Sequence, residues 1–239
     1  MRQDSVNALL SHAKAELFKI EEEYSASLQR KDIAPSLQID IKNLMENLRS
    51  ALEYMARDIY EKLIQTVRNA KSQPEVSNIY FPYGKDENDF KSAIGRNLPN
   101  LDSISAPVFS LIECIQPHKC GNSWLYDFCN IVNDNKHNSL TPQTRKERKS
   151  YKVGLRGGKT AISAPAGAIK APRRAIRIGN QPVIFDPSTG IPYPTPGLQV
   201  EVTTWISFRF TDTKLEVLSL LKLAHKEIKS LAKDLYTLI

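Results

Sequence analysis

Residues 36–67, SLQIDIKNLMENLRSALEYMARDIYEKLIQTV, decide the fold of this chain. Their apolar side chains recur at steps of three and four, the period of one face of an α-helix. The stripe comprises Leu37, Ile41, Leu44, Leu48, Leu52, Met55, Ile59, Leu63 and Val67. At 3.6 residues per turn it continues for roughly eight turns. The sequence therefore predicts one long amphipathic helix, with Ser36 as its N-cap after Ala34-Pro35.

A second stripe of alternating charge lies beside the apolar one. It comprises Arg49, Glu53, Arg57 and Glu61, each four residues after the last. Opposite charges at this spacing stabilise an exposed helix by about 0.2–0.5 kcal/mol a pair. The pattern favours a solvated helix face, and the alternative is that these charges belong to an active site.

Two helices are predicted at the ends of the chain. Residues 5–30 carry the apolar stripe Val6, Leu10, Ala13, Leu17, Ile20, Tyr24 and Leu28. A last helix opens at Thr213, and Glu216 three residues later completes a capping box. Its stripe is Leu218, Leu221, His225, Ile228, Leu231 and Leu235. We expect this last helix to return to the helical body and close its core.

Two shorter helices are predicted between them. Residues 108–115 follow Pro107, a favourable first helical residue, and end before Pro117. The next helix is capped by Asn122 or Ser123 and has the apolar face Trp124, Leu125, Phe128, Ile131 and Val132. This helix places Asn133, Asp134 and His137 near its C-terminal end.

Residues 72–103 are predicted to form a long loop, because prolines and glycines interrupt them repeatedly. Four aromatic side chains, Tyr80, Phe81, Tyr83 and Phe90, are expected to pin this loop to the core. A loop of this length in a compact chain is often functional.

The pattern changes to β-structure between residues 141 and 211. Residues 175–185 predict two short strands around the turn pair Gly179-Asn180, and residues 190–197 form a proline-rich linker. Alternation over residues 198–210, with Trp205 the exception, predicts a half-buried strand. The predicted fold is mainly α: an up-and-down helical bundle with a small antiparallel β insertion before the C-terminal helix. The expected domains are residues 1–140, 141–211 and 212–239.

Composition and charge narrow the classes of function. The chain has 239 residues, 41% of them hydrophobic, and no apolar run long enough to span a bilayer. Its N-terminal residues contain an early acid and no apolar signal core, so we expect a cytoplasmic protein. The net charge of +7 is uneven: residues 145–177 hold eleven Lys or Arg against Glu147 alone, a segment charge of +10.

The three cysteines do not form a recognisable metal motif. Cys114, Cys120 and Cys129 have irregular spacing relative to each other and to His118 and His137. Structural zinc sites use paired ligands at short regular intervals. An odd number of cysteines without a signal peptide also argues for reduced thiols. We therefore predict no metal and no cofactor.

Four short motifs carry a resemblance to known proteins. They are NLRSALEYMARDI (47–59), IYFPYG (79–84), ECIQPH (113–118) and KHN (136–138). This pattern of an LRxAL helix, an FP loop, a QP turn and a KH at a helix end resembles an uncharacterised bacterial family over roughly residues 40–140. More distantly, the bundle resembles the HEPN superfamily, whose members include toxin–antitoxin and phage-defence proteins and whose catalytic members are metal-independent ribonucleases.

The HEPN resemblance makes His137 and Asn133 the candidate catalytic residues. The superfamily motif is an Arg, often followed directly by Asn, with a His four to six residues after the Arg. Aligning on His137 puts Asn133 at the asparagine position and Val132 at the arginine position. Ribonuclease chemistry needs a base and a cation near the phosphate, and this sequence lacks the local cation. The alternatives are that Lys136-His137 only stabilises the negative end of a helix dipole, or that His137 binds without catalysing.

The basic segment predicts contact with a polyanion. Dense Lys and Arg attract phosphates and release counterions on binding. The candidate nucleic-acid-binding residues are Arg145, Lys146, Arg148, Lys149, Lys152, Arg156, Lys159, Lys170, Arg173, Arg174 and Arg177. The sequence GKT at 158–160 lacks the first glycine of a P-loop. The competing interpretation is a solvated hairpin whose charges keep its edges soluble.

These observations define three expectations for function. The first is binding of RNA or DNA through the basic insertion, in a defence or toxin–antitoxin setting. The second is an endoribonuclease that uses His137. The third is a non-catalytic protein-interaction module or homodimer, for which the long second helix offers a surface.

Overall fold

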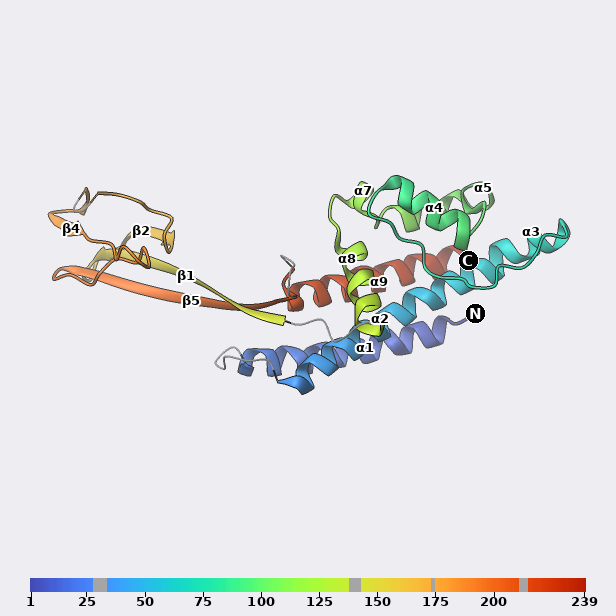
Figure 1. Cartoon of the computed structure of the whole chain (residues 1–239), viewed down its shortest axis with the longest axis horizontal. Helices are drawn as coiled ribbons and strands as arrows, with labels where there is room; N and C mark the ends of the chain where they lie inside the picture. Colours follow the sequence, from blue (N-terminus) through green and yellow to red (C-terminus); the bar gives the residue numbers. More distant parts are fainter. Residues whose placement is uncertain (28–33, 138–142, 173–174, 211–214) are drawn as a thin grey trace. The chain divides into compact units, whose positions relative to one another are not determined.

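The computed structural model describes residues 1–27, 34–137, 143–172, 175–210 and 215–239, with side chains except at 27, 136–137, 143–146 and 203–208. The chain is mainly helical, with a small antiparallel sheet before the C-terminal helix, as the sequence predicts (Figure 1). It divides into two compact units. The helical unit comprises residues 1–143 and 210–239, and the β unit comprises residues 144–209. In the described ranges no helix is long and apolar enough to cross a membrane.

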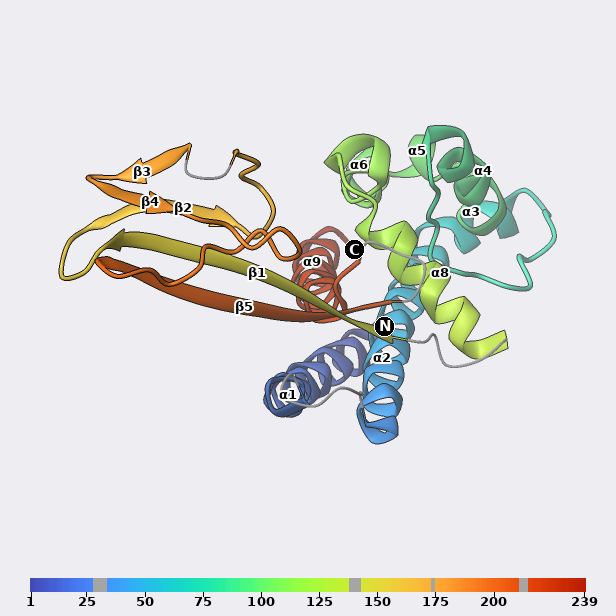
Figure 2. The ribbon, with the colours of Figure 1, turned by 60° about the vertical axis from the view of Figure 1, so that its left-hand side comes forward.

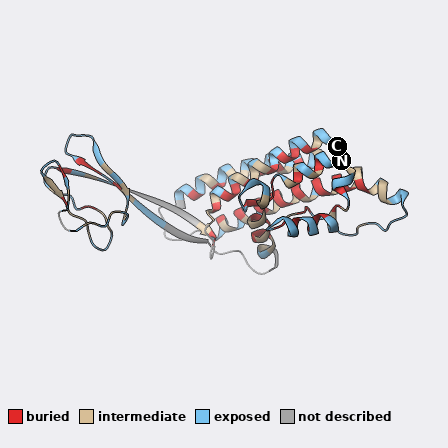
Figure 3. Ribbon diagram, turned by 90° about the horizontal axis from the view of Figure 1, so that it is seen from above, coloured by how far each residue is buried: buried red, intermediate tan, exposed pale blue. Residues whose placement is uncertain are grey.

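Helix α2 (Pro35–Ile59) is the centre of the helical unit (Figure 2). It packs against α1 (Gln3–Ser27), α8 (Trp124–His137) and α9 (Val217–Leu238), and α9 also contacts α1. The predicted stripe of α2 is its buried face, and Figure 3 shows buried residues along the helices that pack together. Leu44, Leu48, Leu52 and Met55 are fully buried. The C-terminal helix α9 thus completes the core around α2.

The long second helix is continuous but not regular. After Ile59 the backbone forms a π-helical turn, η1 (Tyr60–Ile64), and then α3 (Gln65–Ala70). A π turn adds one residue to the helical repeat. As a result Ile64 is buried, whereas Leu63, which the regular stripe predicts at this place, is only partly covered.

The prediction of an uninterrupted loop over residues 72–103 is wrong. Residues 87–97 form α4 (Glu87–Asn97) and residues 101–104 form α5 (Leu101–Ile104). The Asp86 carboxylate caps α4 by accepting a 3.0 Å hydrogen bond from the Asp89 backbone N–H. Gly95, one of the residues that suggested a loop, lies on the exposed side of α4, where a helix tolerates glycine at modest cost.

Three predicted helix boundaries also change. Helix α2 begins at Pro35 rather than after Ser36, because proline at the first helical position has no N–H to satisfy. Pro117 follows α6 (Ala106–Glu113) but itself begins the short helix α7 (Pro117–Cys120). Helix α9 begins at Val217 with Glu216 as its N-cap, so Glu216 is not the third helical residue that the capping box requires. Thr213 lies outside the described residues.

Five strands are formed by the residues that the structure describes in and beside the β unit. In its main sheet β1 (Gln143–Leu155) lies between β2 (Thr160–Pro165) and β5 (Leu198–Phe210). β1 and β2 are antiparallel, with Tyr151 opposite Ala164 and Val153 opposite Ile162. The strands β3 (Ile176–Ile178) and β4 (Gln181–Val183) form the predicted hairpin around Gly179, whose φ of 57° suits glycine.

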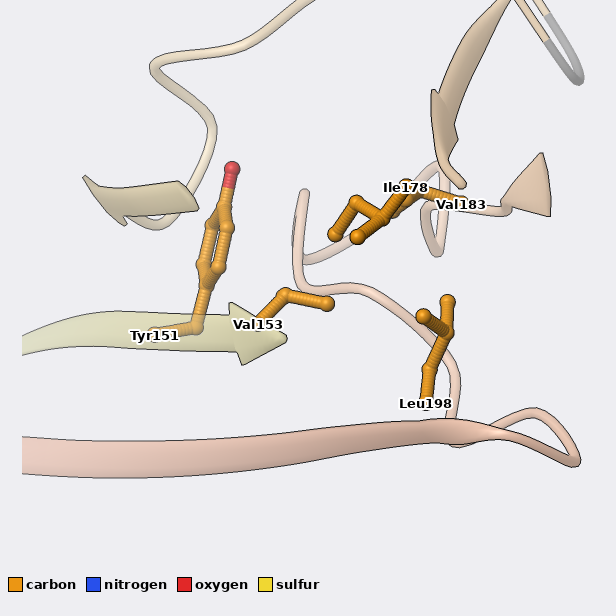
Figure 4. Packing of buried hydrophobic residues seen from close by; sticks show 5 residues of the cluster. All are labelled: Tyr151, Val153, Ile178, Val183 and Leu198. Carbon is orange, nitrogen blue, oxygen red and sulfur yellow. The ribbon is translucent and has the colours of Figure 1, made fainter. Parts of the chain in front are cut away.

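A small apolar core holds the β unit together (Figure 4). It comprises Tyr151, Val153, Ile178, Val183 and Leu198. The alternation predicted for residues 198–210 buries Leu198 and Phe210. It does not bury Val202, which is 47% exposed although it has the same parity.

A buried carboxylate ties both ends of the chain to α2. Asp58 is 1% exposed and accepts hydrogen bonds from the Arg2 backbone N–H at 2.7 Å, the Arg2 guanidinium at 2.9 Å and the Tyr236 hydroxyl at 2.9 Å. Arg2 also pairs with Glu61, and this hydrogen bonding lowers the pKa of Glu61 to about 2. The termini therefore lie at one end of the helical unit (Figure 1).

We predict that Asp58→Ala lowers the free energy of unfolding by about 2–3 kcal/mol, because it leaves the partly buried Arg2 backbone N–H and Tyr236 hydroxyl without their acceptor and removes one of the two carboxylates that pair with Arg2. Tyr236→Phe removes one neutral donor and is expected to cost about 1 kcal/mol. Urea denaturation measures both changes. Asp40→Ala, an exposed position on the same helix, is the control and is expected to change stability by less than about 0.5 kcal/mol. An equal loss in Asp40→Ala and Asp58→Ala would contradict the role of the buried carboxylate.

Candidate functional site

Of the eight Lys and Arg side chains that the structure describes in the β unit, Arg209 is partly buried and the other seven are exposed. The exposed seven are Arg148, Lys149 and Lys152 on β1, Arg156 and Lys159 in the turn to β2, Lys170 after β2, and Arg177 on β3. None of these seven makes an ion pair with an acid among the described residues, and the Arg177 guanidinium donates to the Asn180 carbonyl oxygen at 2.8 Å. The predicted binding residues Arg145 and Lys146 have side chains outside the described set, and Arg173 and Arg174 lie outside the described residues.

Strand alternation places Arg148 and Lys152 on the face of β1 opposite its core, whereas Lys149 shares the parity of the core residues and is exposed. Tyr151 and Val153 are buried in the apolar cluster, and the intervening Lys152 is exposed on the opposite face. Lys152 shares a shallow hollow with Gln199 and Glu201 of β5. Over residues 144–209 there are twelve Lys or Arg and three Asp or Glu, which gives the β unit a formal charge of +9. The remaining residues carry −2, so the basic character belongs to this unit alone.

The helical unit contains a cavity of about 1080 Å³. Three elements and one loop line it: α2, α4, α8 and residues 78–84. The lining is polar and aromatic, with Arg49, Glu53, Asn78, Tyr80, Phe81, Tyr83, Gly84, Asp89, Ser92, Ala93, Arg96, Asn97, Tyr126, Asn130 and Asn133. Of the sequence-predicted site residues, the structure brings Asn133 to this cavity.

Arg49 corrects the expectation of a solvated charge stripe. Its side chain is only 7% exposed, and its Nη2 lies 2.5 Å from Glu53 Oε1. Its Nη1 donates to Cys129 Sγ at 2.6 Å, and its Cζ lies 5.0 Å from the centroid of the Tyr83 ring. The expectation holds better for Arg57 and Glu61, whose side chains are 36% and 32% exposed. The spacing of four identifies the ion pairs but not which of them is buried.

Tyr83 joins the FP loop to α8. The Asn133 Nδ2 donates to the Tyr83 hydroxyl at 3.0 Å, and the Tyr83 and Tyr126 rings lie 6.3 Å apart at 56°. Burial raises the pKa of the Tyr83 phenol above its usual value. The hydroxyl therefore stays protonated near neutral pH and keeps a fixed place between α2 and α8.

The loop conformation depends on Gln116, which the sequence argument quoted only as part of the QP turn. Gln116 is fully buried; its Nε2 donates to the Pro82 carbonyl at 3.2 Å, and its Oε1 accepts from the Gly84 N–H at 3.3 Å. A side chain at Gly84 would place Cβ 2.3 Å from the Phe90 backbone nitrogen, so only glycine fits there. The Phe81 N–H donates to Glu53 Oε2 at 2.6 Å. The LRxAL, FP and QP motifs therefore meet in one hydrogen-bonded assembly.

The candidate catalytic pair is placed only in part. His137 is the last residue of α8, four residues after Asn133, and its side chain lies outside the described set. Asn133 is already a donor to Tyr83. Arg49 of α2 lies over the ring of Tyr83, to which Asn133 donates, and it is paired with Glu53. The cavity's other guanidinium, Arg96 on α4, is exposed and makes no ion pair with the described residues.

The cysteines are unbonded thiols. Cys114 and Cys120 are exposed and Cys129 is buried. Burial raises the pKa of Cys129 to about 12, so this thiol stays protonated and accepts the Arg49 hydrogen bond. Across the described residues, no group of three or more His, Cys, Asp or Glu is arranged to hold a metal ion.

Comparison with known proteins does not assign the chain to a class. No protein-family model, no curated protein and no solved structure matches it. The function of the chain is therefore inferred from the geometry of its two units.

We predict that Arg49→Met lowers the free energy of unfolding by about 3 kcal/mol, because it leaves the partly buried Glu53 without its cation. Arg57→Met on the same helix removes an equivalent i,i+4 pair at an exposed position and is expected to cost less than about 1 kcal/mol. Chemical denaturation of both variants checks this difference. Similar losses at the two positions would show that Arg49 is not an organising contact.

Proposed function

We propose that this chain binds nucleic acid, RNA or DNA, through the exposed cations of its β unit. The observation that carries the proposal is the set of seven exposed Lys and Arg side chains that make no ion pair with an acid in the described structure. Cations that a protein neutralises internally contribute little to binding phosphates. Cations left in solvent displace the counterions of a nucleic acid and gain affinity from their release.

The distribution of charge supports the same conclusion. A unit at +9 attached to a body at −2 concentrates its field on one surface. Such a field steers a phosphate backbone toward the β unit without recognising a base sequence. The apolar core of the unit leaves the charged face of β1 free for this contact.

We predict that neutralising Arg145, Lys146, Arg148 and Lys149 with glutamine weakens binding of a fluorescent oligonucleotide and flattens its salt dependence. Each lost phosphate contact reduces the slope of log K against log salt by about 0.9 on a duplex and about 0.7 on a single strand. Fluorescence anisotropy at several salt concentrations measures both quantities.

A matched variant separates local contact from net charge. Lys14, Lys19, Lys229 and Lys233 are exposed on helices of the helical unit, and changing them to glutamine removes the same charge. This control is expected to bind nearly as wild type. The proposal fails if the two quadruple variants have the same affinity and salt slope, or if wild type shows neither binding nor salt dependence.

A metal-independent endoribonuclease that uses His137 is the alternative. The position of Asn133 on the cavity wall, four residues before His137, is the observation that keeps it open. The ion pair of Arg49 with Glu53 weighs against Arg49 as the cation that phosphate chemistry needs, which leaves Arg96 for that role.

Incubation with mixed RNA in the presence of a chelator tests this alternative. Under the binding proposal wild type leaves the RNA intact while still shifting its mobility. Cleavage by wild type that disappears in His137→Ala would replace the binding proposal with the enzymatic one.

The biological setting belongs to the same proposal. The quoted motifs suggest an HEPN-like bundle, a cytoplasmic location, a homodimer and a role in phage defence or a toxin–antitoxin system. The convergence of the LRxAL, FP and QP motifs on Arg49, Glu53 and Gln116 supports a shared structural role for those motifs.

A further inference from the structure

The cavity of the helical unit has its own chemistry, distinct from the surface of the β unit. Its charged groups balance: Arg49 pairs with Glu53, and the rim holds Asp89 and Arg96. A cavity with this balance does not select a highly charged ligand. Its specificity must come from neutral groups.

The cavity's neutral polar groups with spare hydrogen-bonding capacity are two carboxamides on α8, together with Asn78 and Ser92. The Asn130 side chain makes no hydrogen bond to the described residues, and Asn133 uses its Nδ2 on Tyr83 but not its Oδ1. Asn97, by contrast, is used on both sides, since its Oδ1 accepts from the Tyr80 N–H and its Nδ2 donates to the Ala93 carbonyl. Asn130 and Asn133 are three residues apart and lie on one face of the helix.

Aromatic rings accompany these amides. Tyr126 precedes Asn130 by four residues on α8, and the Tyr83 ring lies 6.3 Å from the Tyr126 ring. Tyr80 lines the same cavity and is 56% exposed. A solvent-exposed ring beside a cavity offers a face on which a planar ligand can stack.

We propose that this cavity binds a nucleobase, with the Asn130 carboxamide on the hydrogen-bonding edge and the tyrosine rings on its faces. A planar amide presents one donor and one acceptor side by side, which matches the edge of a purine or pyrimidine. A volume of about 1080 Å³ accommodates a base together with its sugar.

Titration with adenosine, guanosine, cytidine and uridine tests the site directly. Nucleosides carry no phosphate, so the cations of the β unit do not contribute to their binding. We expect at least one nucleoside to bind, by ligand-observed NMR or calorimetry, and Asn130→Ala to weaken it about tenfold or more. Asn43→Ala, an exposed asparagine on α2, is the matched control and is expected to bind as wild type.

Two further arms identify the source of the base. The first compares a nucleoside with its 5′-monophosphate in wild type and Arg96→Gln. Selective loss of affinity for the monophosphate indicates a free nucleotide. The second compares a single-stranded oligonucleotide with the same strand made abasic. If the cavity binds a base that belongs to a strand, Asn130→Ala should weaken binding of the normal strand but not of the abasic one.

The outcomes of this experiment are separable from those of the proposed function. If oligonucleotide binding shows no salt dependence but nucleosides still bind, only the proposal of a polyanion surface on the β unit is rejected. The base site is overturned if no nucleoside, monophosphate or normal strand distinguishes Asn130→Ala from Asn43→Ala. Circular dichroism of both variants verifies that the helical unit is folded.

Discussion

A charge removed from water must find a partner, and this constraint organises the helical unit. Arg49 is buried because Glu53, Cys129 and Tyr83 surround its guanidinium, and these partners come from α2, α8 and the FP loop. Asp58 is buried on the same helix because Arg2 and the Tyr236 hydroxyl satisfy it. The apolar stripe of α2 determines which face of the helix is buried. The buried charges Arg49 and Asp58 then fix the position of the FP loop and of the two chain ends that contact them.

The β unit follows the opposite rule. Its small core of Tyr151, Val153 and their neighbours occupies one face of β1, so cations on the other face stay in water without internal partners. Leaving them solvated costs no desolvation and keeps them available for phosphates. We therefore propose different kinds of recognition for the two units: binding of a polyanion by the positive surface of the β unit, and binding of a base by the amides and rings of the cavity.

Periodicity predicts most of the backbone, and local chemistry explains what it misses. The helices α1, α2, α8 and α9 follow from sequence because each buries one apolar face, and β5 has the extent of the alternating run that predicts it. Helix α4 was missed because prolines and glycines around it suggested a loop, although Asp86 with the N–H of Asp89 forms a cap. The burial of Arg49 could not be deduced, because its partners Tyr83 and Cys129 are distant in sequence. Asn133 was found through a motif at a helix end; the cavity that it lines required the fold.

Hydrogen–deuterium exchange of the whole chain, with and without a single-stranded oligonucleotide at low salt, tests the central claim most directly. Phosphate binding by solvated cations predicts slower exchange over residues 148–165, which contain the described basic part of β1, its turn and β2. This protection should fade as salt is raised. Unchanged exchange over these residues, with oligonucleotide bound, would contradict the assignment of nucleic-acid binding to the β unit.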